Sequence, residues 1–193
     1  MRQNVGMGTI NTMNIRIERA RSSYDFRADP SKPDGFGNNW KNNSKDWLVL
    51  RDGGTELARF RCQSVANYCF GANATADTVA HGDTVAPRPF ELRLFVEPRR
   101  FHGEIHAITR TRDLDGQWIG RDAMQTTAGG YQNGRWLVHD RWSEAQGGDT
   151  NYAWSAGCFI LSSGDLESLN TLLRACRCRP GDVIPGEVIE LDA

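Results

Sequence analysis

The chain has 193 residues and a formal net charge of −1, from 23 lysines and arginines against 24 aspartates and glutamates. This length suits one domain that buries a core without metal ions or disulfides. The balanced charge gives no long-range field to gather polyanions or anionic membranes, so we expect no nucleic acid partner and no membrane insertion.

Residues 1–22 contain no continuous apolar stretch of the kind a secretory signal needs, and nothing later reaches membrane-spanning length. We therefore expect a protein that is made in the cytoplasm and lacks a conventional export signal. Residues 1–46 are expected to supply an N-terminal strand and a long loop to the same domain as residues 47–193.

In the first third of the chain, apolar and charged side chains alternate over residues 13–20, which predicts a half-buried or edge strand. Residues 27–46 are rich in Gly, Pro, Asn and Asp and predict a long loop. Two short apolar runs on either side of Asp52-Gly53-Gly54 predict a hairpin.

After residues 71–85, which again resemble a loop, the remaining segments favour strands at residues 90–98, 101–112, 135–140, 158–161 and 182–191. One helix is expected at residues 163–176, with Ser162 or Ser163 as its cap, a leucine face and Pro180-Gly181 as its stop. The chain is therefore expected to be mainly β with one principal helix, as a mixed β-sandwich or barrel-like domain.

Two apolar runs carry side chains with catalytic chemistry, His139 in the first and Cys158 at the start of the second. A thiolate is a strong nucleophile, and it needs a base or a positive neighbour to be populated near neutral pH. His139 supplies that base if the two strands bring it to Cys158. Asp140 would point to the opposite strand face, so we expect a backbone carbonyl to orient the imidazole.

The turn before the cysteine, Ser155-Ala156-Gly157, consists of small residues that let a substrate carbonyl approach the backbone. The N–H groups of Gly157 and Cys158 would then stabilise a tetrahedral oxyanion. The alternative is that Cys158 and His139 are structural, since free cysteine is among the most buried residue types.

The other four cysteines, Cys62, Cys69, Cys176 and Cys178, are expected to take no part in catalysis. Cys62 could pair with Cys69 across a short loop, whereas Cys176 and Cys178 are too close in sequence for easy disulfide geometry. Because the chain has 5 cysteines, at least one stays unpaired within a monomer.

The order and spacing of His139 and Ser155-Ala156-Gly157-Cys158 resemble the L,D-transpeptidase catalytic domain, a family of cysteine enzymes that remodel bacterial peptidoglycan. That family's pattern is a histidine, a spacer of about fifteen residues, and then Ser/Thr-His-Gly-Cys. Residues 83–90 are similar to its Thr-Pro-x-Gly-x-Phe segment, and residues 180–184 to its closing Gly-x-x-Val strand. The likeness begins at about Thr84 and implies an L,D-transpeptidase-like β-sandwich.

The chain departs from the family pattern at three places. The histidine before Gly-Cys is Ala156 here, the arginine two residues after the cysteine is Ile160, and the glycine of the upstream segment is missing. The base histidine is retained as His139. The departures imply altered recognition of the acidic end of the donor stem peptide. They place the chain nearer to antibacterial effectors and phage proteins, which reach the periplasm or cell wall by non-classical delivery.

The resemblance implies a peptidoglycan-modifying enzyme, an L,D-transpeptidase or L,D-carboxypeptidase that forms an acyl-enzyme on Cys158. Its site would comprise Cys158, His139, Gly157 and Ser155, with no metal ion and no organic cofactor. Its partners would be peptidoglycan stem peptides and, for an effector, an immunity or delivery protein.

Two other functions stay open. One is a catalytically silent binding or structural module of the same fold, which Ala156 and Ile160 favour. The other is a zinc-dependent hydrolase, because His102, Glu104 and His106 alternate and would share one strand face. A further zinc ligand would have to come from His81 or His139.

Overall fold

The computed structural model describes residues 12–24, 26–28, 40–42, 46–66, 84–96, 104–120, 123–127, 131–133, 136–140, 155 and 157–192. Within these ranges the protein is mainly β, with the α-helix α2 at Ser163–Ala175 and the short 3-10 helix η1 at Arg21–Tyr24. No helix in this part of the chain is long and apolar enough to cross a membrane.

The strands are β1 (Met13–Ala20), β2 (Phe26–Ala28), β3 (Trp40–Asn42), β4 (Asp46–Asp52), β5 (Thr55–Cys62), β6 (Pro89–Val96), β7 (Ile105–Thr111), β8 (Ala123–Gln125), β9 (Tyr131–Asn133), β10 (Trp136–Asp140), β11 (Phe159–Leu161) and β12 (Val183–Leu191). Ten of them form one mixed sheet in the order β11-β10-β7-β6-β12-β1-β4-β5, with β8 and β9 attached beside β7. Strands β2 and β3 form a separate pair.

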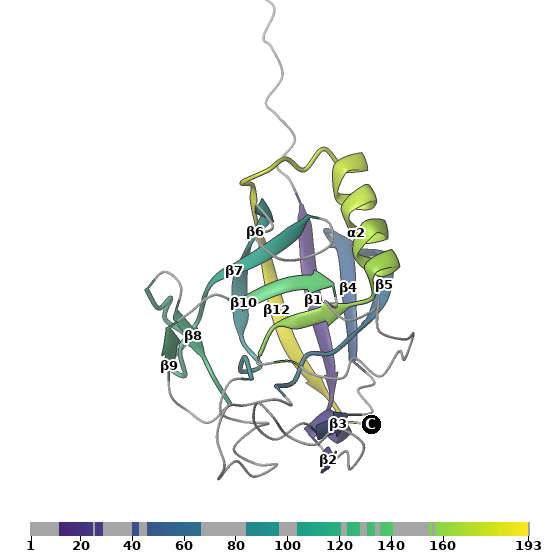
Figure 1. Ribbon diagram of the computed structural model, residues 1–193. Coiled ribbons are helices and arrows are strands. Elements are labelled where there is room, and N and C mark those ends of the chain that lie inside the picture. The colour runs from purple at the N-terminus through teal and green to yellow at the C-terminus, as the bar shows by residue number, and fades with distance from the viewer. Residues whose placement is uncertain are drawn as a thin grey trace, which may run out of the picture.

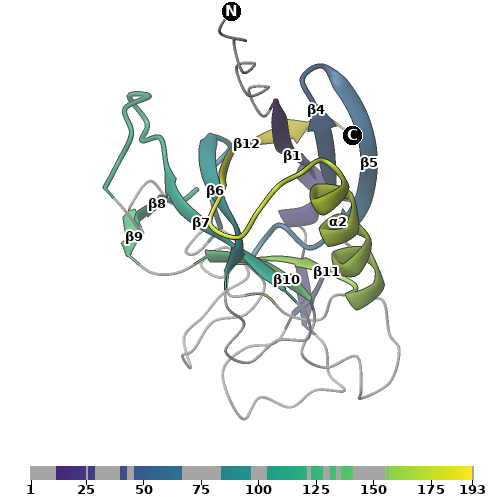
Figure 2. The ribbon, with the colours of Figure 1, turned by 90° about the horizontal axis from the view of Figure 1, so that it is seen from above.

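The two ends of the large sheet meet. Gln63, directly after β5, exchanges two backbone hydrogen bonds of 2.9 and 3.0 Å with Ile160 of β11. The sheet therefore closes on itself and takes the barrel-like form of the expected architecture. Figure 1 shows β10 and β11 crossing in front of β1 and β12, and Figure 2 shows β6 and β7 joining these two layers on one side, with α2 on the other.

The interior is filled by the alternate, inward-facing residues of the strands and by Leu166, Leu169 and Leu173 of α2. Phe90 packs against Phe159 with ring centroids 5.9 Å apart. It also lies so close to Gly186 of β12 that a Cβ there would come within 2.2 Å of the Phe90 ring. Glycine at this position therefore lets β6 and β12 pair around a large aromatic side chain.

A buried polar cluster holds the region where the sheet closes. Arg19 is fully buried and donates to the Ser64 hydroxyl at 2.8 Å and to the Val85 carbonyl at 2.9 Å. Asp46, also fully buried, accepts from the hydroxyls of Ser23 and Ser64, each at 2.5 Å. Ser64 thus connects the two charged groups and fixes the backbone beside Gln63, the residue that pairs with β11.

Most of the predicted elements are confirmed, including the hairpin at residues 46–62 and the final strand at 182–191, which is the single strand β12. Residues 13–20 are half-buried as expected, but an edge position is wrong because β1 lies between β12 and β4. The predicted loop at 27–46 contains β3, which pairs with β2; residues 29–39 and most of 71–85 lie outside the described residues.

The helix begins where predicted, with Ser162 as its cap. It ends at Ala175, one residue before the predicted end, but Pro180-Gly181 lie too far beyond that point to be its stop. Arg177 takes a left-handed backbone conformation with φ of 65°, and the N–H of Cys178 bonds to the Leu173 carbonyl at 3.0 Å. These features form the usual left-handed C-terminal cap, here without a glycine.

Candidate active site

Strands β10 and β11 bring Cys158 and His139 to the same face of the sheet. The two strands pair in parallel, with His139 beside Ile160 and Val138 beside Phe159. Residues in register point to the same side, and residues two apart on a strand share a face. Cys158 directly precedes β11, two residues before Ile160, so continued strand alternation would place its side chain on the His139 side. Phe159 and Val138 point to the opposite side, where Phe159 meets the core.

The imidazole of His139 is held by the backbone. The side chain is buried, and its Nδ1 atom lies 2.5 Å from the carbonyl oxygen of Asp140. A carbonyl only accepts, so Nδ1 carries the proton and Nε2 keeps the lone pair that a general base needs. The expectation that a backbone carbonyl orients this ring is confirmed. Burial lowers the pKa of His139, and the bond to Asp140 offsets part of that effect, so the ring is neutral at pH 7.

The thiol of Cys158 is not activated at rest. The residue is half-buried, and burial raises the pKa of its thiol to about 11, although a hydrogen bond from the Leu137 backbone lowers it in part. At pH 7 only about one thiol in ten thousand would then be ionised. A reaction at Cys158 therefore requires a base that removes the proton during the attack.

The turn before Cys158 is fixed by Ser155. Its hydroxyl oxygen accepts from the Gly157 N–H at 3.0 Å and donates to the Cys158 carbonyl at 2.7 Å. Gly157 has φ of 124°, a conformation that residues with a Cβ rarely adopt. In this structure the Gly157 N–H donates to Ser155, so it is not directed at a substrate, and its oxyanion role stays a prediction. The oxyanion role of the Cys158 N–H also stays a prediction. Ser155 and Gly157 together shape the turn.

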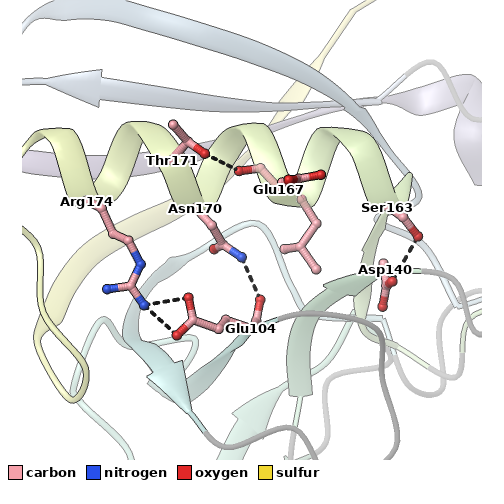
Figure 3. Close-up of a pocket in the computed structure, with 8 residues that line it drawn as sticks. Glu104, Asp140, Ser163, Glu167, Asn170, Thr171 and Arg174 are labelled. Atoms are coloured by element: carbon pink, nitrogen blue, oxygen red, sulfur yellow. Dashed lines mark hydrogen bonds and ion pairs between the residues drawn. The ribbon is translucent and has the colours of Figure 1, made fainter.

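On the reverse side of β10, Asp140 faces α2, as strand alternation predicts. Its fully buried carboxylate accepts a hydrogen bond of 2.9 Å from the Ser163 hydroxyl in the first turn of the helix. A cavity of about 420 Å³ lies between the helix and β7 and β10. Figure 3 shows Asp140, Asn170 and the Glu104–Arg174 ion pair around it. This cavity was not predicted from the sequence, in which the serine at the helix start is a weak local signal for it.

The two described residues of the zinc motif, Glu104 and His106, are engaged with other partners. His106 is fully buried and its Nδ1 accepts from the Phe95 N–H at 3.1 Å. Glu104 is paired with Arg174. Where the structure describes the chain, no group of three or more His, Cys, Asp or Glu side chains could hold a metal ion. His81 and His102 lie outside that part.

The remaining predicted residues fall in different places. Ile160, which replaces the arginine of the resembling family, is buried beside His139. Cys62 and Cys178 are buried in the core, and Cys176 is half-buried at the helix end, all consistent with packing roles. Cys69 and Ala156 lie outside the described residues.

Comparison with known proteins gives one informative relative. The chain is 54% identical over 179 residues to an uncharacterized protein of Treponema pallidum (strain Nichols), a match that covers 92% of this chain and 80% of the relative. The chain belongs to the same family as that protein. No family model matches the chain, and no solved structure matches it. The name of the Treponema relative carries no activity.

Proposed function

We propose that the protein is a cysteine acyltransferase of the L,D-transpeptidase or L,D-carboxypeptidase type that acts on peptidoglycan stem peptides. The observation that supports it most is the held imidazole. His139 shares a sheet face with Cys158, and its Nδ1 proton is directed to the Asp140 carbonyl. Nε2 is thereby kept as the acceptor for the thiol proton.

In the proposed reaction His139 Nε2 removes the Cys158 proton as the sulfur attacks the carbonyl carbon of an L,D peptide bond. The tetrahedral intermediate collapses as the imidazolium returns that proton to the leaving amine, which releases a D-amino acid and leaves a thioester on Cys158. An acceptor, water or an amine, then gives its proton to His139 and attacks the thioester. The acyl group leaves with the acceptor and the thiol is restored.

Recognition of the donor stem would differ from that of the resembling family. Ile160 offers no charge to an acidic group of the substrate, and its side chain lies in register with His139. We therefore propose donors whose terminal part is held by apolar contacts and backbone groups.

A second candidate is a silent module that binds the same class of peptide. The raised pKa of the Cys158 thiol and the engagement of the Gly157 N–H favour it, since both describe a site at rest. The two candidates differ in whether His139 makes Cys158 reactive.

The deciding experiment incubates the purified protein with disaccharide-tetrapeptide fragments of peptidoglycan. Intact-protein mass spectrometry should detect the acyl-enzyme, and muropeptide masses should report loss or exchange of the terminal D-amino acid. Cys158→Ala is the matched control and should show neither. Binding of the fragment without any acyl-enzyme or mass change, in a folded protein, would favour the silent module.

A further inference from the structure

Two of the contacts of Asp140 lie on opposite sides of β10. Its backbone carbonyl lies 2.5 Å from His139 Nδ1, on the side of the candidate nucleophile. Its carboxylate lies on the other side and accepts the 2.9 Å hydrogen bond from Ser163. Sequence alternation assigns the side chain to that face but gives no reason for a carboxylate there.

The end of β10 is where such an anchor has an effect. Asp140 is the last residue of the strand, so its carbonyl group lies at the end of the ladder with β11. A residue at a strand end can shift unless something restrains it. The side chain and the carbonyl leave the same Cα, so an anchored carboxylate holds that Cα, and with it the end of β10, in place beside His139.

The anchor itself is rigid. Ser163 is the first residue of α2, and the helix is packed on the core through Leu166, Leu169 and Leu173. The positive end of the helix dipole also favours a carboxylate at this position. Asp140 is fully buried and Ser163 is half-buried, at the wall of the cavity between α2 and β10.

We propose that Asp140 is a positioning residue: its carboxylate, anchored by Ser163 at the start of α2, holds the carbonyl that keeps the proton on His139 Nδ1. The inference rests on the proposed function, since a fixed tautomer matters only if His139 acts as a base. Loss of the anchor lets the carbonyl turn, and part of the population then protonates Nε2, the atom that must accept the thiol proton.

The test measures the pH profile of Cys158 alkylation by iodoacetamide, followed on the Cys158 peptide by mass spectrometry. The variants are Asp140→Ala, Asp140→Asn, Ser163→Ala and His139→Gln in the full chain. Asp165→Asn is the matched control, because it removes a carboxylate from the same helix turn without reaching β10. Nitrogen NMR shifts of the 4 histidine rings report the tautomer of His139 directly.

Asp140→Ala should slow alkylation at pH 7 about tenfold, on the scale seen when groups that orient a functional imidazole are removed. Ser163→Ala should slow it by a smaller factor, and Asp140→Asn, which keeps an acceptor of the same shape, should restore most of the rate. His139 should show mixed tautomers in Asp140→Ala and only the Nδ1–H form in the wild type and Asp165→Asn. A merely structural role would lower the melting temperature without changing the tautomer.

The outcomes separate this inference from the proposed function. If His139→Gln slows alkylation but folded Asp140→Ala keeps both the rate and the Nδ1–H tautomer, the positioning role is overturned and the proposed base stands. If His139→Gln leaves alkylation unchanged, the base and the positioning role both fail. Should Asp140→Ala not fold, Ser163→Ala decides, since its loss of one hydroxyl leaves the core intact.

Discussion

Two buried histidines on neighbouring strands have opposite hydrogen-bond polarity. His106 of β7 is in register with Val138 of β10, one residue before His139, so the two rings point to opposite faces. Both have a lowered pKa because of burial. His106 Nδ1 accepts from the Phe95 N–H, whereas His139 Nδ1 faces the Asp140 carbonyl. His106 therefore carries its proton on Nε2, and His139 carries it on Nδ1.

This difference shows that the backbone partner of Nδ1 decides what a buried histidine can do. The side chain of Asn170 lies close to this ring and partly offsets the effect of burial on the pKa of His106. That ring is a neutral donor inside the core. The Nδ1–H tautomer of His139 leaves Nε2 as an acceptor, which is the form that a base needs.

The largest effect should come from replacing His139 by glutamine. The same replacement at His106 is the comparison. His139→Gln should lower turnover on stem peptides about a hundredfold or more, the usual scale for a general base. His106→Gln should leave turnover within about threefold, because its ring lies on the other face. Steady-state kinetics with a circular dichroism check of folding measures both.

The losses from Cys158→Ala and His139→Gln should not add, because a nucleophile and its base act as one unit. Full turnover by folded His139→Gln would remove the distinction between the two histidines.

For the stability of the fold in acid, His106 should matter more than His139. The pKa of His106 is about 4 in the folded protein against 6.5 for the ordinary group. The unfolded chain takes up the proton first, so this stabilisation is complete above pH 6.5 and is lost as the pH falls toward 4. The loss amounts to about 3 kcal/mol over that window. Urea unfolding at pH 7 and pH 4.5 measures it.

His106→Gln cannot titrate, so its stability should fall less over the same pH window. His139 adds to the wild-type slope in the same direction, which leaves a residual acid effect in the variant. If the free energy of unfolding of His106→Gln fell with pH as steeply as that of the wild type, the burial of this ring would have no thermodynamic cost.

The helix and most of the longer strands could be predicted from the sequence, but the pairing that closes the sheet into a barrel could not. Alternating strands, the turn at Gly53 and the leucine face of α2 are local patterns, and all three are present in the structure. The pairing of Gln63 with Ile160 uses only backbone groups, which leave no trace in side-chain order. The short strand β8 was missed because three residues are too few to show a period.

The candidate site was predicted in part for the same reason. The order and spacing of His139 and Cys158 are visible in the chain, and alternation predicted that Asp140 would point away. The tautomer of each histidine depends on a carbonyl or N–H direction, which composition does not encode. The occupied Gly157 N–H follows from the hydroxyl of Ser155, whose rotamer is fixed only in the folded turn.

An intermediate effect should come from Ser155→Ala, which tests whether the turn before Cys158 positions its thiol. The change removes the acceptor of the Gly157 N–H and the donor to the Cys158 carbonyl. Two lost hydrogen bonds should lower the free energy of unfolding by about 1–2 kcal/mol, and a looser turn should slow Cys158 alkylation. Ser155→Thr keeps the hydroxyl and serves as the control. Equal alkylation rates in all three proteins would show that the turn does not position the thiol.

The smallest effect should come from the ion pair near His106. Glu104 and Arg174 are 43% and 46% exposed, so Glu104→Gln should cost less than about 0.5 kcal/mol. Arg174→Ala should cost more, about 1 kcal/mol, because the guanidinium also lies 4.3 Å over the ring of Phe95 and covers it. The N–H of Phe95 fixes the tautomer of His106. The packing of Arg174 on the Phe95 ring therefore also helps to hold His106. A larger loss in Glu104→Gln than in Arg174→Ala, measured by urea unfolding, would instead assign that support to charge.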